Sequence, residues 1–275
     1  MKLKDKVVLV TGGAHGIGKA LCERFASEGA AGVAVADIEL DAAQAVAHKI
    51  SSSGTQAIAL HCDVSEEEPI RDAVRRTEEE LGPIDLLVSN AGFGFGDGPG
   101  WTAASQTNKQ WDEVWRVNVM AHVWAARAVL PSMIQRGGGY LLNTVSAAGL
   151  LSQIGDASYS TTKHAAIGFA ESLAITHGDQ GIKVSVLCPQ GVKTRLIEVE
   201  EVVKKSVSTD GLLEPEQVAD DVVQALDEER FLIVPHPESL EYLRRKVADY
   251  DRWLHGMRRF RRSLFPSDDI MDLES

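Results

Sequence analysis

Three residues near the middle of the chain, Ser146, Tyr159 and Lys163, have the types and the spacing of a proton-transfer site. Side chains four residues apart on a helix share a face, so Lys163 is expected one turn beyond Tyr159. An isolated phenol has a pKa of about 10, and a cation held beside it favours the phenolate and lowers that pKa by roughly 1–3 units. A hydroxyl from Ser146 would hold a substrate oxygen against Tyr159. Together they predict proton transfer to or from an alcohol or carbonyl oxygen.

A glycine-rich turn near the N-terminus supports this interpretation, because Tyr-x-x-x-Lys alone is also common as a half-buried tyrosine beside a lysine. Residues 6–11 are apolar and β-branched, which predicts a buried strand, and residues 19–28 have helical spacing. The turn between them contains Gly12, His15, Gly16, Ile17 and Gly18. A dinucleotide pyrophosphate site requires this order, because glycines let the backbone approach the phosphates and the helix N-terminus attracts them. A glycine cluster alone also marks ordinary turns.

The second expected strand, residues 32–36, ends at an acid that bears on the choice of cofactor. This acid is Asp37, nineteen residues after Gly18, and Ile38 follows it. An acid here accepts hydrogen bonds from both ribose hydroxyls and repels a 2′-phosphate, so NAD is expected rather than NADP. The alternatives for Asp37 are a helix N-cap and a solvated acid in a loop.

Taken together, these motifs resemble the short-chain dehydrogenase/reductase family along nearly all of the first 235 residues. The sequence Thr11-Gly12-x-x-x-Gly16-x-Gly18 is similar to the cofactor turn of that family, and Asp63-Val64 to its adenine-contacting pair. The resemblance implies further cofactor contacts from Asn90, Ala91, Gly92, Tyr159, Lys163, Pro189, Val192 and Thr194. It also implies a catalytic set made of Asn118, which would hold a relay water, and of Ser146, Tyr159 and Lys163.

Two positions depart from the pattern of the family. Ser89 stands where the family usually has an asparagine, at the end of the fourth expected strand. Gln190 stands where the family usually has a glycine after the proline. The second departure bears on the shape of the pocket beside the nicotinamide, and the chemistry of the site is expected to be unaffected.

Composition and charge limit the kinds of protein that this chain can be. It has 275 residues, 44% of them hydrophobic, which suffices for one α/β domain or for one domain with a tail. The net charge of −12 argues against nucleic acid as the main partner. We expect no membrane span, no signal peptide and no metal site. The scattered cysteines Cys22, Cys62 and Cys188 are expected to be reduced core thiols of a cytoplasmic protein.

Apolar strand segments alternate with helical segments along the chain. The expected strands are residues 6–11, 32–36, 55–61, 84–89, 139–145, 182–188 and 231–235. This alternation predicts an α/β fold with a doubly wound parallel sheet of about seven strands, of the Rossmann type, and a ligand crevice at the carboxyl ends of the strands. Residues 1–237 would form this single nucleotide-binding and catalytic domain.

Residues 238–275 are expected to form a C-terminal extension. Apolar residues recur at spacings of three and four between Glu238 and Leu264, which predicts an amphipathic helix. Its apolar side includes Tyr250, Leu254 and Met257 and has to be covered, so we expect a homo-oligomer, a dimer or tetramer, with this helix in the contact. The basic end, residues 258–262, would either contact a membrane surface or acidic partner, or consist of solvated or paired arginines. Residues 266–275 are expected to be a frayed acidic tail.

Three segments are candidates for the wall of a substrate pocket, residues 93–101, 149–154 and 196–213. Their apolar side chains favour a hydrophobic secondary alcohol or ketone, although the aromatic residues could also be surface or interface packing. The chain as a whole predicts an NAD-dependent oxidoreductase that transfers a hydride between nicotinamide and such a substrate. Two alternatives stay open. One is an NADPH-dependent ketone or 3-oxoacyl reductase, which Asp37 disfavours, and the other is a catalytically silent nucleotide-binding scaffold or sensor.

Overall fold

The computed structural model describes residues 1–98, 102–197 and 201–265. A sheet of seven parallel strands in the order β3-β2-β1-β4-β5-β6-β7 forms its centre, so the expected Rossmann-type fold is confirmed. Every expected strand is present, within a few residues of its predicted bounds. The strands are β1 (Val7–Thr11), β2 (Gly32–Asp37), β3 (Gln56–His61), β4 (Leu86–Ser89), β5 (Gly139–Thr144), β6 (Ile182–Leu187) and β7 (Leu232–Ile233).

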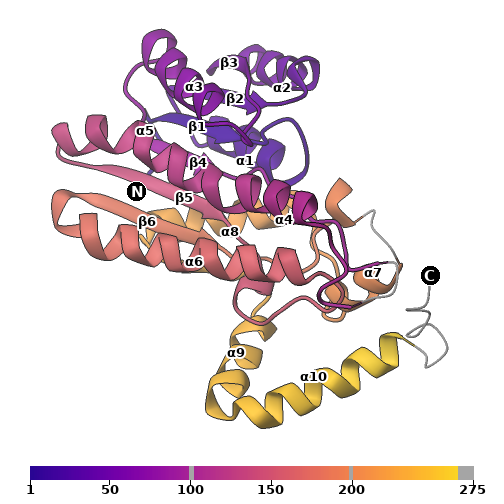
Figure 1. Ribbon diagram of the computed structural model, residues 1–275. Helices are drawn as coiled ribbons and strands as arrows, with labels where there is room; N and C mark the ends of the chain where they lie inside the picture. Colours follow the sequence, from indigo (N-terminus) through magenta and orange to yellow (C-terminus); the bar gives the residue numbers. More distant parts are fainter. Residues whose placement is uncertain (99–101, 198–200, 266–275) are drawn as a thin grey trace.

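Helices cover both faces of the sheet (Figure 1). Strands β1 and β2 are buried along their whole length, as expected for apolar runs that are covered on both sides. One apolar core lies between the sheet and the helices α1 (Gly16–Ser27), α2 (Leu40–Ser52) and α8 (Pro215–Asp227). The core on the opposite face is closed by α3 (Glu67–Glu80), α5 (Ala121–Gln135) and α6 (Ala157–His177).

The strand order reverses between β1 and β4, so the carboxyl ends of these two strands border the crevice where ligands bind in open α/β sheets. The side-chain amide of Asn90, just after β4, donates hydrogen bonds to the carbonyl oxygens of Thr11 (3.1 Å) and Gly12 (3.2 Å), just after β1. This contact holds the glycine-rich turn against the neighbouring strand and fixes the floor of the crevice.

Within the described part of the chain, one helical stretch, residues 108–135, is long and apolar enough to cross a membrane, and its most apolar window has a mean hydropathy of 1.2. It consists of α4 (Asn108–Trp115), the π-helical turn Arg116–Met120 and α5. Half of its most apolar window is buried inside the fold, where α5 packs against the sheet and α3. The stretch is therefore a core helix, whose apolar composition serves the interior of the domain.

The C-terminal extension differs from its expected form. Where one helix was predicted, there are two, α9 (Glu238–Ala248) and α10 (Tyr250–Leu264). The backbone at Asp249 is extended, and its carboxylate accepts a hydrogen bond from the Arg252 amide (2.9 Å), so Asp249 caps α10. Figure 1 shows that α10 then runs back towards α7 (Glu201–Val207), with which it is in contact. The predicted acidic tail, residues 266–275, lies outside the described residues.

Candidate active site

The three residues of the predicted proton-transfer site come together at the carboxyl end of β5. Ser146 follows this strand, and Tyr159 and Lys163 lie one turn apart in α6. The first turn of α6 is fixed by Asp156, whose carboxylate accepts a hydrogen bond from the Tyr159 amide (3.0 Å). The Lys163 amine lies 5.4 Å from the centre of the Tyr159 ring and donates to the carbonyl oxygen of Thr144 (3.3 Å). Two elements, one strand end and one helix, therefore position the whole set.

The hydroxyl of Ser146 is held by the backbone. It caps the short 3₁₀ turn Ala147–Gly149, and its oxygen accepts a hydrogen bond from the Ala148 amide (3.0 Å). The same hydroxyl is near enough to that of Tyr159 to act on the tyrosine pKa, and both residues line the same cavity. An alcohol or carbonyl oxygen between the two hydroxyls would contact both.

The charge states of this set are governed by burial. Burial raises the pKa of Tyr159 to about 12, and the Ser146 hydroxyl opposes part of that rise. Burial also lowers the pKa of Lys163 to about 8. In the protein alone, desolvation of the phenolate is thus the dominant effect on the tyrosine, and the lowering of its pKa by Lys163 stays a prediction. At neutral pH the tyrosine is a neutral phenol, and the lysine beside it is still mostly charged.

Asn118 lies in the π-helical turn Arg116–Met120 and is fully buried. Its amide nitrogen donates to the carbonyl oxygen of Phe93 (2.9 Å) and to the hydroxyl of Thr162 (3.2 Å), and its oxygen accepts from the Phe93 amide (3.1 Å). The side chain therefore holds the start of the loop that follows β4, at Phe93, against α6. The assignment of a relay water to Asn118 stays a prediction.

A cavity of about 280 Å³ opens above the glycine-rich turn, and its lining fits a dinucleotide. A Cβ atom on Gly12 would lie 2.9 Å from the Cα atom of Ala91, and one on Gly18 only 2.0 Å from the carbonyl oxygen of Gly12. Only glycine is compatible with such a close approach of backbone to backbone. The predicted cofactor residues that line the cavity are Gly12, His15, Gly16, Ile17, Asp37, Asn90, Ala91, Gly92, Tyr159, Lys163, Pro189, Val192 and Thr194.

Four predicted cofactor residues do not line this cavity. Gly18 packs beneath the turn, Ile38 is largely exposed, and Val64 is buried in the core. The Asp63 carboxylate accepts a hydrogen bond from the Ser65 amide (2.9 Å) at the end of β3. The lining also includes Thr144, Val145 and Arg195, which the sequence motifs missed, and Gln190 and Leu196, which the sequence placed beside the nicotinamide and in a substrate-wall segment. Of these, Thr144 and Val145 could have been found from their place at the carboxyl end of a predicted strand.

Asp37 is buried at the edge of the cavity, at the end of β2. Its two oxygens accept hydrogen bonds from the backbone amides of Ala14 (3.0 Å) and Glu39 (3.0 Å). The carboxylate therefore holds the turns that follow β1 and β2 together. Each of its oxygens retains a second lone pair, with which it can accept a hydrogen bond from a ligand hydroxyl.

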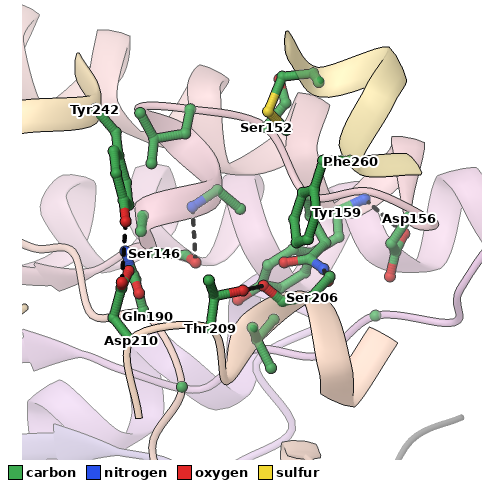
Figure 2. Close-up of a pocket in the computed structure, with 18 of the residues that line it drawn as sticks. Ser146, Ser152, Asp156, Tyr159, Gln190, Ser206, Thr209, Asp210, Tyr242 and Phe260 are labelled. Carbon is green, nitrogen blue, oxygen red and sulfur yellow. Dashed lines mark hydrogen bonds between the residues drawn. The ribbon is translucent and has the colours of Figure 1, made fainter. Parts of the chain in front are cut away.

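A second cavity, of about 330 Å³, adjoins the first and has a largely apolar surface (Figure 2). Ser146, Tyr159, Gln190 and Leu196 line both cavities. All three predicted wall segments contribute to the second, for example through Phe95, Leu151 and Val207, while residues 99–101 and 198–200 of these segments lie outside the described residues. The sequence did not predict a fourth contribution, which comes from the extension through Tyr242, Trp253, Met257 and Phe260.

The three cysteines are free and buried, which confirms them as core thiols. Burial raises the pKa of both Cys62 and Cys188 to about 12, so neither is a thiolate at neutral pH. Within residues 1–98, 102–197 and 201–265, no group of three or more His, Cys, Asp or Glu side chains is placed to hold a metal ion.

Comparison with known proteins identifies the family. The family model described as short chain dehydrogenase matches residues 6–202, which include the glycine-rich turn and all four predicted catalytic residues. The chain belongs to this family. It is therefore an oxidoreductase whose fold binds a nicotinamide cofactor.

Individual relatives of this short-chain dehydrogenase cover nearly the whole chain. It is 34% identical to 1-deoxy-11-beta-hydroxypentalenate dehydrogenase of Streptomyces exfoliatus, over 93% of this chain and 91% of that protein. It is 32% identical to cyclohexanol dehydrogenase of an Acinetobacter species, over 83% and 90% of the two chains. The crystal structure of a short chain dehydrogenase/reductase from Burkholderia phymatum in complex with NAD matches it with a TM-score of 0.83 at 27% identity, over 91% of this chain and 96% of that one.

Proposed function

We propose that this short-chain dehydrogenase is an NAD-dependent enzyme that interconverts a hydrophobic secondary alcohol and the corresponding ketone. The observation that carries the proposal is the position of Ser146 and Tyr159, which line both the glycine-walled cavity and the apolar cavity. A substrate in the second cavity would therefore present its oxygen to both hydroxyls while its carbon faces the first cavity.

In the first cavity, bound NAD supplies the group that takes the hydride from the alcohol carbon. Tyr159 exchanges the proton of the substrate oxygen, and Ser146 holds that oxygen beside the tyrosine. Lys163, which is mostly protonated below its pKa of about 8, keeps a positive charge next to the forming phenolate and would also bind the cofactor ribose. In the direction of oxidation, Tyr159 would first release its own phenol proton, and the phenolate beside Lys163 would then take the proton of the alcohol oxygen while the alcohol carbon gives up a hydride.

The preference for NAD rests on Asp37, whose buried carboxylate would repel the 2′-phosphate of NADP. The solved relative with the TM-score of 0.83 was crystallised with NAD, which supports the same choice. The second candidate is an NADPH-dependent ketone or 3-oxoacyl reductase, favoured by Arg195, a cation that lines the cofactor cavity. Arg195 is paired with Glu39 (2.8 Å), so its charge is already compensated.

The proposed substrate class follows from the apolar surface of the second cavity. The names of two relatives, a cyclohexanol dehydrogenase and a hydroxypentalenate dehydrogenase, support a secondary alcohol on a largely hydrocarbon body. We place the enzyme in the cytoplasm, because three free thiols suit a reducing compartment.

A homo-oligomer, a dimer or tetramer, is also part of the proposal. Val247, Tyr250 and Leu254 of the extension are exposed, and a contact between copies would cover them. Light scattering measures the assembly directly, and a monomer at micromolar concentration would contradict this part of the proposal.

A panel of secondary alcohols tests the activity, with NAD or NADP in excess and the absorbance of the reduced cofactor as readout. We expect turnover of cyclic apolar alcohols with a higher kcat/KM for NAD than for NADP. Turnover with NADP alone would support the second candidate. Absence of turnover with every alcohol and ketone, although the cofactor binds, would favour the silent scaffold or sensor instead.

A further inference from the structure

The extension is fastened to the catalytic part of its own chain by a buried lysine. Lys246 of α9 is 7% exposed, and its amine donates hydrogen bonds to the carbonyl oxygens of Leu150 (2.8 Å) and Leu151 (3.1 Å). These two residues belong to the segment that links Ser146 to Tyr159 along the chain. A buried amine requires such hydrogen-bond acceptors, because the removal of a charged amine from water is strongly unfavourable unless new hydrogen bonds replace those to water.

Two more hydrogen bonds fasten α9 to other walls of the substrate cavity. The amide of Gln190, at the position where the family usually has glycine, donates to the hydroxyl of Ser239 (2.8 Å). The hydroxyl of Tyr242 donates to the carboxylate of Asp210 (2.9 Å), a contact drawn in Figure 2. A glycine at position 190 would have no side chain to make the first of these bonds. The residue that departs from the family pattern, Gln190, thus forms a hydrogen bond with the extension.

The second helix of the extension, α10, presents one side to the cavity. Trp253, Met257 and Phe260, at spacings of four and three, line it, and Figure 2 shows Phe260 beside Tyr159. Tyr250 and Leu254, on the flank of this side, are 55% and 45% exposed, and the Tyr250 ring centre lies 5.7 Å from the Lys246 amine. The side chains over the cavity therefore continue into apolar side chains that face solvent.

The far end of α10 and the loop that follows β4 line the same cavity, through Phe260 and Phe95. Arg261 is close enough to Asp97 in this loop to oppose the rise in pKa that burial imposes on the Asp97 carboxyl. One arginine of the basic end, residues 258–262, thus acts on an acidic residue of its own chain. The cavity is bounded by Phe95 of the loop, Leu151 of the catalytic segment and the α10 side chains.

We propose that α9 and α10 form the specificity-determining wall of the substrate cavity within a single chain, and that this wall selects a bulky, rigid apolar body, of two fused rings or more. The matched family model ends at residue 202, before the extension begins. The volume of about 330 Å³ lies in the range of cavities that enclose whole organic ligands. A small alcohol held by Ser146 and Tyr159 would fill less of this volume and would gain less from contact with the α10 side chains. This inference rests on the proposed function for the identity of the reacting group.

The test compares a decahydronaphthol with sec-butanol as substrates of the full-length enzyme, with NAD. Variants Trp253→Ala, Phe260→Ala and Lys246→Met alter the wall or its anchor, and Val247→Ala and Leu254→Ala are matched controls at exposed apolar positions of the extension. In the wall variants we expect the ratio of kcat/KM for decahydronaphthol to that for sec-butanol to fall about tenfold or more. In both controls the ratio should stay within about twofold of the wild-type value, as for other exposed positions.

Equal losses for both substrates, or equal changes in wall variants and controls, would overturn the proposal. A binding measurement separates this outcome from failure of the proposed function. If the wild-type enzyme oxidises neither alcohol, calorimetric titration with decalone, the ketone of the bulky probe, still reports on the wall. Weaker binding to Phe260→Ala than to Leu254→Ala would support the proposal, and equal binding would overturn it.

Discussion

The Rossmann-type core and the C-terminal extension are held in place by different kinds of contact. Strands β1 and β2 bury every residue, and helices pack on both faces of the sheet. Helix α10 has no buried residue, and the buried residues of α9 are the polar Ser239 and Lys246, each bonded to the catalytic part. The core is stabilised by apolar burial, whereas a few polar anchors and the cavity contacts fix the extension.

This difference separates two tasks. The residues that would move the proton and bind the cofactor are supported by a core whose stability does not depend on substrate. The wall over the substrate is attached to that core and has few buried apolar contacts, which places it among the parts of a protein that open locally at low cost. Substitutions in the core should therefore change turnover with every substrate, whereas substitutions in the extension should change the preference between substrates.

The largest effect is expected from Tyr159→Phe in the core. Removal of the hydroxyl deletes the proton-transfer oxygen and leaves the packing nearly unchanged, so turnover should fall about 10²–10⁴-fold with every substrate. Binding of NAD, measured by calorimetry, should be retained. The same substitution at Tyr250, exposed on α10, is the control and should leave turnover near wild type. If Tyr159→Phe keeps more than about a tenth of the wild-type rate, the assignment of the acid–base residue is wrong.

The next largest effect is expected on the preference for NAD over NADP, which should depend on Asp37 in the core and not on the extension. Asp37→Ser removes the charge that would repel a 2′-phosphate and a ribose acceptor, so the ratio of kcat/KM for NAD to that for NADP should fall by about ten- to a hundredfold. Asp37→Asn, which keeps one acceptor oxygen, should give an intermediate ratio. No wall variant of α10 should change this ratio. A wild-type enzyme that prefers NADP would contradict the assignment outright.

A smaller effect is expected on the pH dependence of stability. His122 in α5 is fully buried, and burial together with the charge of Lys163 lowers its pKa to about 3. Below pH 6.5 the unfolded chain binds a proton there that the folded protein excludes, so stability falls as the pH drops from 6.5 towards 3.

Removing His122 should therefore reduce the loss of stability on acidification. In His122→Phe the loss of unfolding free energy between pH 7 and pH 5 should be smaller by about 2 kcal/mol, as measured by urea denaturation. Leu254→Phe, at an exposed position of α10, is the control in the extension and should leave the pH dependence unchanged, because it neither adds nor removes a titrating group. Identical pH profiles for His122→Phe and wild type would contradict the effect assigned to burial.

Local patterns were sufficient to predict the core. Most of its strands are short apolar runs that end at, or are followed within two residues by, glycine, aspartate, asparagine or serine, and parallel strands bring those residues to one edge. Asn90 and Gly12 therefore meet as predicted, and so do Ser146 and Tyr159. Both pairs could be predicted from the spacing of apolar residues along the chain and from the rule that ligands bind at the carboxyl ends of parallel strands.

The remaining features depend on contacts between distant residues, which no local pattern contains. The extension was predicted as one helix because Asp249 interrupts the sequence without interrupting the apolar period. Its place over the cavity depends on Lys246 reaching Leu150, almost a hundred residues earlier. The spacing shows the lysine beside Tyr159, whereas the effect of burial on the Tyr159 pKa depends on the whole fold and could not be predicted from it.

The most direct test of the account uses a secondary alcohol that carries deuterium on its carbinol carbon. The enzyme is incubated with this alcohol and NAD, and the reduced cofactor is isolated and analysed by mass spectrometry. The account predicts that the label moves into the reduced cofactor, and that none enters when unlabelled alcohol reacts in deuterium oxide, because the carbon gives a hydride while Tyr159 takes only the hydroxyl proton. Reduced cofactor without the label, or labelled from solvent, would contradict the central claim.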